Sequence, residues 1–186
     1  SIVNGVDVSS YQKTIDWDKA KADGIDYAFI RVAFRGYGDS GSLNSDGKYK
    51  ENLTNAVKAG VKVGVYIYSQ AITVEEGIEE ANYILERIKG YDVSLPVVID
   101  YEYAATGLGR LYNANLSKRQ ATDICLAFCE TVEAAGYDAM VYANKSMLQS
   151  SLYASELSEK YQIWLANYTA KTTYGGTYQY WQYTSS

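Results

Sequence analysis

Apolar runs typical of β-strands alternate along the chain with segments in which apolar residues recur at helical spacing. The predicted strands cover residues 4–11, 26–34, 61–71, 94–103, 137–144, 161–169 and 177–185. The predicted helices cover residues 17–24, 49–60, 75–90, 117–136 and 145–152. Because parallel strands need crossover connections, this alternation predicts βα units around a largely parallel sheet.

Turn and cap residues support several of these boundaries. Gly24 and Gly90 follow predicted helices, and Ser117 is placed to cap the helix that comes after it. Pro96, the one proline of the chain, lies near the start of a predicted strand, where the missing N–H is tolerated.

The connection between the last two predicted strands is too short for a helix. We therefore expect these two strands to pair as a hairpin, after a longer part of the chain in which strands and helices alternate. The predicted fold class is α/β. We expect an irregular TIM-like (β/α) barrel, with βα units first and bare β-strands at its C-terminal end.

Length and composition indicate one globular domain over residues 1–186, with 47% hydrophobic and 21% charged residues. No stretch approaches the roughly 20 apolar residues of a membrane-spanning helix, so we expect no membrane insertion. The chain starts at Ser1 without an initiator Met or an apolar signal segment, as expected for a mature form or an excised domain.

The chain contains no histidine, which excludes Ser-His-Asp, Cys-His and histidine-ligated metal mechanisms. Proton transfer then falls to carboxylates, Tyr, Lys, Cys or water. The net charge of −5 argues against nucleic acid as a partner, because proteins that bind it carry a basic face. Cys125 and Cys129, four residues apart in a predicted helix, are expected to be buried thiols. We expect no metal and no cofactor.

Three acidic residues lie at the ends of predicted strands, where α/β barrels carry their reactive groups. Asp7 ends the first apolar run, and Asp100 and Glu102 end the run PVVIDYEY. Because side chains alternate along a strand, Asp100 and Glu102 share one face while Tyr101 points to the other. Repulsion between two close carboxyls raises one pKa and leaves an acid beside an anion. Cleavage of a glycosidic bond requires such a pair.

A purely structural role is the alternative for each of these acids. Asp100 and Glu102 would then pair with Arg or Lys, or accept backbone hydrogen bonds at the strand end. Asp7 would form a turn in DVSS, since Asp and Ser bond to their own backbone.

Tyrosine is unusually frequent, with 20 residues against 3 Phe and 3 Trp. A rigid ring with a polar tip suits a surface that binds a partly apolar, partly hydroxylated ligand such as a sugar. Aromatic residues stand near the ends of several predicted strands, namely Tyr66, Tyr68, Trp164, Tyr168, Trp181 and Tyr183. Together they predict a sugar-binding cleft, and the alternative for each is packing in the core or at its rim.

Six segments in order, GVDVSSYQ, YAFIRVAFRGYG, GVYIYSQA, PVVIDYEY, IWLANYT and WQYT, together resemble glycoside hydrolase family 25. Members of this family are lysozymes of the Chalaropsis type, the N-acetylmuramidases of bacteria and phages. The resemblance covers nearly the whole chain. It implies an irregular barrel that cleaves the β-1,4 bond between N-acetylmuramic acid and N-acetylglucosamine in peptidoglycan.

The resemblance also implies roles for the site residues. Glu102 is expected to be the general acid, and Asp7 to shape the cleft. Asp100 is expected to stabilise positive charge or to orient the 2-acetamido group of the substrate for internal attack, with retention of configuration. Tyr66 and Trp164 match cleft positions of the family. The family's further acidic residue after WQYT has no counterpart here, and we expect any wall-binding module to lie outside these 186 residues.

The expected partner is the glycan strand of peptidoglycan, bound by a monomer that is extracellular or in the cell wall, either secreted or released by a phage. Two alternatives stay open. One is a glycosidase that acts on another 2-acetamido sugar polymer such as chitin. The other is a wall-binding domain without chemistry, which would use the tyrosine-rich cleft alone.

Overall fold

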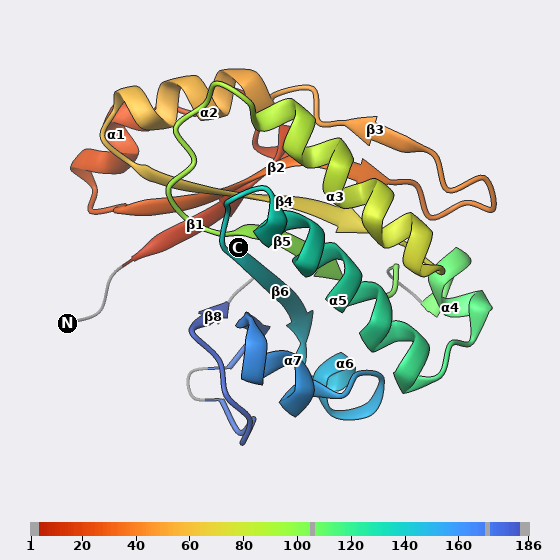
Figure 1. The fold of residues 1–186 in the computed structure, drawn as a ribbon. Helices are drawn as coiled ribbons and strands as arrows, with labels where there is room; N and C mark the ends of the chain where they lie inside the picture. Colours follow the sequence, from red (N-terminus) through yellow and green to blue (C-terminus); the bar gives the residue numbers. More distant parts are fainter. Residues whose placement is uncertain (1–3, 105–106, 170–171, 183–186) are drawn as a thin grey trace.

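A curled sheet of eight strands forms the centre of the protein in a computed structural model that describes residues 4–104, 107–169 and 172–182 (Figure 1). The strands are β1 (Gly5–Val8), β2 (Tyr27–Arg35), β3 (Leu43–Ser45), β4 (Lys62–Ser69), β5 (Val97–Tyr101), β6 (Ala139–Asn144), β7 (Gln162–Ala166) and β8 (Tyr180–Gln182). Seven of them pair in parallel in the order β1-β2-β4-β5-β6-β7-β8, and β3 pairs antiparallel with β2. The prediction of a largely parallel α/β sheet is confirmed.

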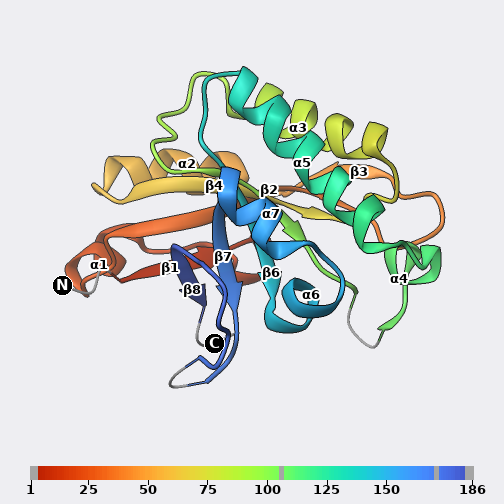
Figure 2. The ribbon, with the colours of Figure 1, turned by 60° about the horizontal axis from the view of Figure 1, so that its bottom comes forward.

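Helices cover the outer side of this sheet (Figures 1 and 2). They are α1 (Trp17–Ala22), α2 (Tyr49–Lys58), α3 (Val74–Ile88), α4 (Arg110–Ala114), α5 (Lys118–Ala134), α6 (Lys145–Ser150) and α7 (Ala154–Lys160), with the 3-10 turn η1 at Ser10–Gln12. The predicted cap of α5 is confirmed, because the hydroxyl of Ser117 accepts a hydrogen bond from the Gln120 backbone N–H at 3.1 Å. None of the described helices is long and apolar enough to span a membrane.

The sheet is a half-barrel, consistent with the irregular TIM-like barrel that the alternation of elements predicts, but it is open and not closed. β1 and β8 are the two ends of the strand order and do not pair within the described residues. The prediction of a hairpin between the last two strands is wrong, because β7 and β8 pair in parallel. The described part of their connection contains no helix, so an irregular crossover returns the chain to the same end of the sheet.

Besides the turn η1, the short elements β3, α4 and α7 are absent from the sequence-based prediction. Each has seven residues or fewer, which is too short to show a clear hydrophobic period. β3 lies in a segment rich in Gly, Ser and Asn, a composition that predicts a loop. Of the last predicted strand, residues 177–185, only Tyr180–Gln182 form a strand, β8, among the described residues. Residues 183–185 lie outside the described ranges.

Two apolar clusters hold the sheet in place. The larger one lies between the sheet and the outer helices, and includes Ile67 and Ile99 from strands and Phe128 from α5. Cys125 and Cys129 are buried in it as free thiols, as predicted. The smaller cluster, called here the inner cluster, lies on the concave face and consists of Phe29, Val98, Met140, Tyr142, Trp164 and Ala166. It forms the floor beneath the carboxyl ends of the strands.

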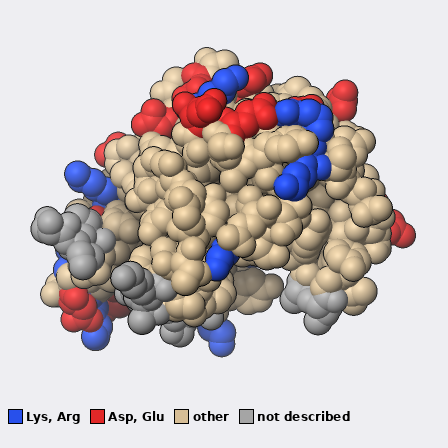
Figure 3. All heavy atoms as spheres, turned by 90° about the horizontal axis from the view of Figure 1, so that it is seen from below, with Lys and Arg blue, Asp and Glu red and all other residues tan. Residues whose placement is uncertain are grey.

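The charge of the protein is not spread evenly over its surface. Figure 3 shows the side on which α6, α7 and β8 lie in Figure 1. Most of this face is free of Lys, Arg, Asp and Glu side chains, and the charged groups gather toward its edges.

A buried ion network ties the end of β2 to α3 and α4. The Arg35 side chain is only 4% exposed and contacts Glu80 at 2.8 Å and Glu79 at 2.6 Å. Glu76 joins the network through Arg110 at 2.8 Å. Burial raises the pKa of Glu80 to about 7, although the hydrogen bonds from Ser69 and Arg35 oppose this shift. A carboxyl in this position needs its cation, since an isolated charge in the interior is costly.

Replacing Arg35 by Met should lower the free energy of unfolding by about 3–5 kcal/mol, because Glu80 would stay buried without its cation. The double variant Arg35→Met/Glu80→Leu should recover part of this loss. Urea unfolding followed by tryptophan fluorescence measures both effects. Lys19→Ala, which removes the exposed pair with Asp23, is the control and should change little. Equal losses for Arg35→Met and Lys19→Ala would contradict the prediction.

Candidate active site

The parallel register aligns four side chains in one row across neighbouring strands. Tyr68, Asp100, Tyr142 and Trp164 are successive Cα partners on β4, β5, β6 and β7. Residues in register in a parallel sheet point to the same face, and Tyr142 and Trp164 belong to the inner cluster. The row therefore faces the inside of the curled sheet.

A cavity of about 220 Å³ opens at the carboxyl ends of these strands. Its lining consists of Asp7, Tyr66, Asp100, Glu102, Tyr142, Trp164, Tyr168 and Gln182. All three acids singled out in the sequence meet here, although Asp7 comes from β1 and the other two from β5 and the residue after it. Tyr101 points the other way, as alternation predicts, and donates its hydroxyl to the Ala71 carbonyl at 3.0 Å.

The predicted aromatic residues divide between this cavity and other places. Tyr66, Trp164 and Tyr168 line it. Tyr68 lies beside it, where burial and the negative charges of Asp100 and Glu102 raise its pKa. Trp181 packs against the larger apolar cluster, between the sheet and the helices, and donates its indole N–H to the Asn167 carbonyl at 2.9 Å.

Alternation along β8 accounts for the position of Trp181. The neighbouring residue, Gln182, faces the cavity, so Trp181 points to the outer layer. Tyr183, also expected near the cleft, lies outside the described residues.

Gln182 connects three of the cavity walls and is absent from the sequence-based prediction. Its Nε2 donates to Asp7 Oδ1 at 2.9 Å. Its Oε1 accepts from the Tyr168 hydroxyl at 3.1 Å and also from the Tyr142 hydroxyl. Since both tyrosines donate to the oxygen, the amide N–H groups are directed to Asp7. The i,i+2 spacing of Tyr180 and Gln182 could have indicated that both side chains lie on the inner face of β8. Tyr142 could be identified as a cavity residue only after β6 is known to pair with β5.

A second layer of hydrogen bonds holds the backbone at Glu102. The buried side chain of Gln70 donates through Nε2 to the Glu102 carbonyl at 2.7 Å. Arg110 donates to the Gln70 carbonyl at 2.8 Å and is itself paired with Glu76. The loop after β5 is thereby connected to the loop after β4 and to the ion network behind it.

Burial dominates the electrostatics of the three acids. It raises the pKa of Asp100 well above its usual value, and the charges of Glu102 and Asp7 raise it further. Burial and the charge of Asp7 raise the pKa of Glu102 to about 7. Burial also raises the pKa of Asp7, against the opposing hydrogen bond from Gln182. All three carboxyls are therefore harder to ionise than free carboxyls, and Glu102 holds its proton up to near-neutral pH.

The purely structural alternative for these acids, pairing with Arg or Lys, is not seen. Asp7, Asp100 and Glu102 form no ion pair within the part of the chain that the structure describes. Asp100 Oδ1 is buried and has no hydrogen-bond partner among the described residues. Glu102 is half-buried, and Tyr168 at the rim is 56% exposed, so the cavity is open to solvent. A proton donor, adjacent anions and aromatic walls are the groups that glycosidic cleavage needs.

Known proteins resemble this chain over nearly its full length. Lysozyme M1 of Streptomyces globisporus is 26% identical over 193 residues, which cover 99% of this chain and 62% of that relative. The chain thus spans less than two thirds of that relative's length. The bacterial lysozyme of Streptomyces coelicolor has a similar solved structure, with a TM-score of 0.79 and 25% identity, covering 100% of this chain and 85% of the other.

A third similar protein is the modular autolysin LytC of Streptococcus pneumoniae, solved in complex with a synthetic peptidoglycan ligand. Its TM-score is 0.79 at 25% identity, over 97% of this chain and 42% of the other. The family model described as glycosyl hydrolases family 25 matches residues 6–186. Because this match covers nearly the whole chain and every residue that lines the acidic cavity, the chain belongs to glycosyl hydrolases family 25.

Proposed function

We propose that this chain is a peptidoglycan hydrolase that cleaves the β-1,4 bond between N-acetylmuramic acid and N-acetylglucosamine. The observation that carries the proposal is the meeting of Asp7, Asp100 and Glu102 in a tyrosine-lined cavity that is open to solvent. Family membership and the lysozymes among its relatives support it. In this proposal residues 1–186 form one catalytic domain that acts as a monomer on glycan strands in the cell wall.

Glu102 is the general acid of the proposed reaction. Its raised pKa keeps the carboxyl protonated below about pH 7. It donates the proton to the oxygen of the leaving N-acetylglucosamine while the bond from C1 of N-acetylmuramic acid to that oxygen breaks. Its half-buried position lets it reach a bound saccharide, whereas Asp100 lies deeper and is only 7% exposed.

Asp100 acts on the positive charge that develops at C1, and Asp7 shapes the cleft around it. In the proposed reaction the carboxylate of Asp100 stabilises this charge, or orients the 2-acetamido group so that its carbonyl oxygen attacks C1. Water then adds its hydroxyl to C1, breaking the bond between C1 and the acetamido oxygen where that bond has formed, and the Glu102 carboxylate takes the remaining proton, which restores the acid. On the acetamido route, the two displacements at C1 retain the configuration of the sugar.

Glu102→Gln should reduce hydrolysis by about 10²–10⁴-fold, because an amide cannot donate the proton that the leaving oxygen needs. The measurement is the release of reducing ends from purified peptidoglycan, with mass analysis of the fragments. Glu159→Gln, which makes the same change at an exposed position, is the matched control and should retain full activity. A Glu102→Gln protein that releases ends at the wild-type rate would refute the proposed acid.

The same assay separates the two other candidate functions. Turnover of chitin oligomers at or above the rate on peptidoglycan would identify a glycosidase for another 2-acetamido polymer. Saturable binding to peptidoglycan without new reducing ends would identify a wall-binding domain. Fragments that end in reducing N-acetylmuramic acid are the result expected for a muramidase.

The Glu102 carboxyl should titrate near pH 7 rather than near its usual 4.5, because burial and the charge of Asp7 oppose its ionisation. Carbon-13 NMR of labelled glutamate carboxyls measures this directly. Hydrolysis should fall as the pH rises through 7, since Glu102 then loses the proton that it donates. In Asp7→Asn the pKa of Glu102 should move down. A wild-type Glu102 that titrates at its usual value would contradict this account.

Gln182→Met should lower the rate of hydrolysis by about 10- to 100-fold, because Asp7 loses a charge-assisted hydrogen bond and two tyrosines lose their acceptor. That bond lowers the pKa of Asp7, so the acid limb of the pH–rate profile should also move to higher pH. Gln149→Met on the surface is the control. A profile identical to that of the wild type would show that Gln182 has no positioning role.

A further inference from the structure

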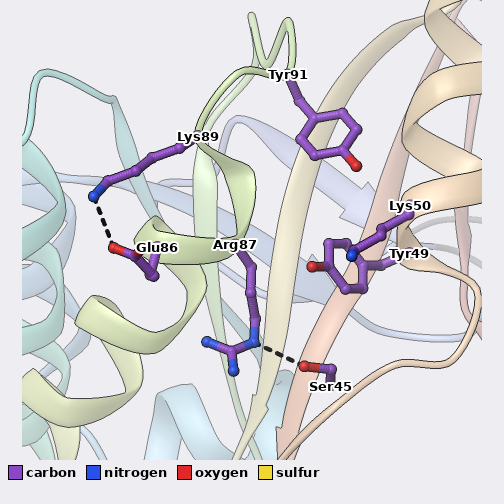
Figure 4. A pocket seen from close by; sticks show the side chains of 7 residues that line it. All are labelled: Ser45, Tyr49, Lys50, Glu86, Arg87, Lys89 and Tyr91. Carbon is purple, nitrogen blue, oxygen red and sulfur yellow. Dashed lines mark hydrogen bonds and ion pairs between the residues drawn. The ribbon is translucent and has the colours of Figure 1, made fainter.

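A second cavity, of about 620 Å³, lies outside the sheet between β3, the start of α2 and the end of α3. Seven residues line it, namely Ser45, Tyr49, Lys50, Glu86, Arg87, Lys89 and Tyr91 (Figure 4). None of them lines the acidic cavity on the concave face. We call this second site the outer cavity.

The outer cavity is positively charged in a protein whose net charge is −5. Lys89 is paired with Glu86 at 2.7 Å, and in Figure 4 this pair turns away from the rest of the lining. Lys50 and Arg87 form no ion pair within the described ranges. Two uncompensated positive charges therefore face one cavity, which favours an anionic ligand.

Arg87 is held in a fixed orientation without the help of a carboxylate. Its guanidinium lies over the Tyr83 ring, 3.3 Å from the centroid, and donates through Nη1 to the Tyr83 carbonyl at 3.0 Å. Its Nε donates to the Ser45 hydroxyl at 2.7 Å. These bonds use two of the five guanidinium N–H groups, and no described residue accepts a hydrogen bond from the other three, which can donate to a ligand. A guanidinium held in this way is suited to bind phosphate oxygens.

The opposite wall of the outer cavity is aromatic and hydroxylated. Figure 4 shows Lys50 lying over Tyr49, with Tyr91 next to them. The Lys50 ammonium is 6.0 Å from the centre of the Tyr49 ring. Rings with hydroxyl tips contact the apolar faces and the hydroxyl groups of sugars and polyols. The cavity thus combines cations for an anion with a wall for a hydroxylated chain.

We propose that the outer cavity binds a phosphate group of a polyol-phosphate or sugar-phosphate polymer. Arg87 and Lys50 bind the phosphate oxygens, and Tyr49 and Tyr91 contact the adjoining polyol or sugar. The choice of a polymer of the cell wall, rather than a small soluble sugar phosphate, rests on the proposed function. The site would hold the protein on an anionic wall while the acidic cavity acts on the glycan strand.

The first test measures binding of inorganic phosphate and of glycerol 3-phosphate by NMR titration. The wild type should bind both, glycerol 3-phosphate more tightly, with shifts at Tyr49 and Tyr91. Arg87→Gln and Lys50→Gln should each weaken binding by about tenfold. The Lys50 side chain forms no hydrogen bond with any of the described residues, so its replacement should leave the fold intact even if loss of Arg87 does not. Lys58→Gln at the exposed end of α2 is the control with the same change of charge.

The outcomes of this titration are separate from those of the hydrolase assay. Binding that is undetectable, or equal in the wild type and in both variants, would overturn the proposal. Loss of reducing-end release in the hydrolase assay would overturn the proposed function and leave the phosphate titration unaffected.

The second test identifies the source of the phosphate. Sacculi that carry phosphodiester polymers should retain the wild type more tightly than sacculi from which hydrofluoric acid has removed them. Lys50→Gln should abolish this difference and keep the wild-type rate of hydrolysis on the stripped sacculi. Equal retention of the wild type on both kinds of sacculi would exclude the polymer as the occupant.

Discussion

The curl of the parallel sheet brings its two edge strands close enough for Gln182 on β8 to donate a hydrogen bond to Asp7 on β1. Near this hydrogen bond, the ring centroids of Phe29 on β2 and Tyr180 on β8 are 5.3 Å apart. Backbone pairing does not close the half-barrel in the described residues, so these side-chain contacts define the concave site. The chemistry depends on this approach, because the charge of Asp7 helps to hold the proton on Glu102.

The acidic cavity reduces the stability of the fold in which it is built. The folded pKa of Asp100 and of Glu102 lies above the unfolded value, so the folded protein binds more protons than the unfolded chain. Stability from this source is fully present below the unfolded pKa and is lost as the pH rises through the folded pKa, which for Glu102 means between about 4.5 and about 7. The hydrogen bonds from Gln70 to the Glu102 carbonyl and from Arg110 to the Gln70 carbonyl hold the backbone in place at this site.

The two cavities on opposite sides of the sheet carry different charges. Asp7, Asp100 and Glu102 line the cavity on the concave side, while Lys50 and Arg87, which form no ion pair among the described residues, line the cavity on the helical side. The buried apolar cluster between the sheet and the helices separates the two cavities. In the two proposals made above, a glycan strand and an anionic wall polymer bind to different surfaces of the same domain.

Local pattern determined much of this protein. Alternation along one strand placed Asp100 and Glu102 opposite Tyr101, and the cap at Ser117 marked the start of α5, because both depend only on neighbours in the chain. The order of the strands and the curl of the sheet depend on packing between distant segments, and no local period encodes them. Only the tertiary structure therefore decided that β8 runs parallel to β7, that the half-barrel stays open, and that Gln182 rather than Trp181 reaches the acids.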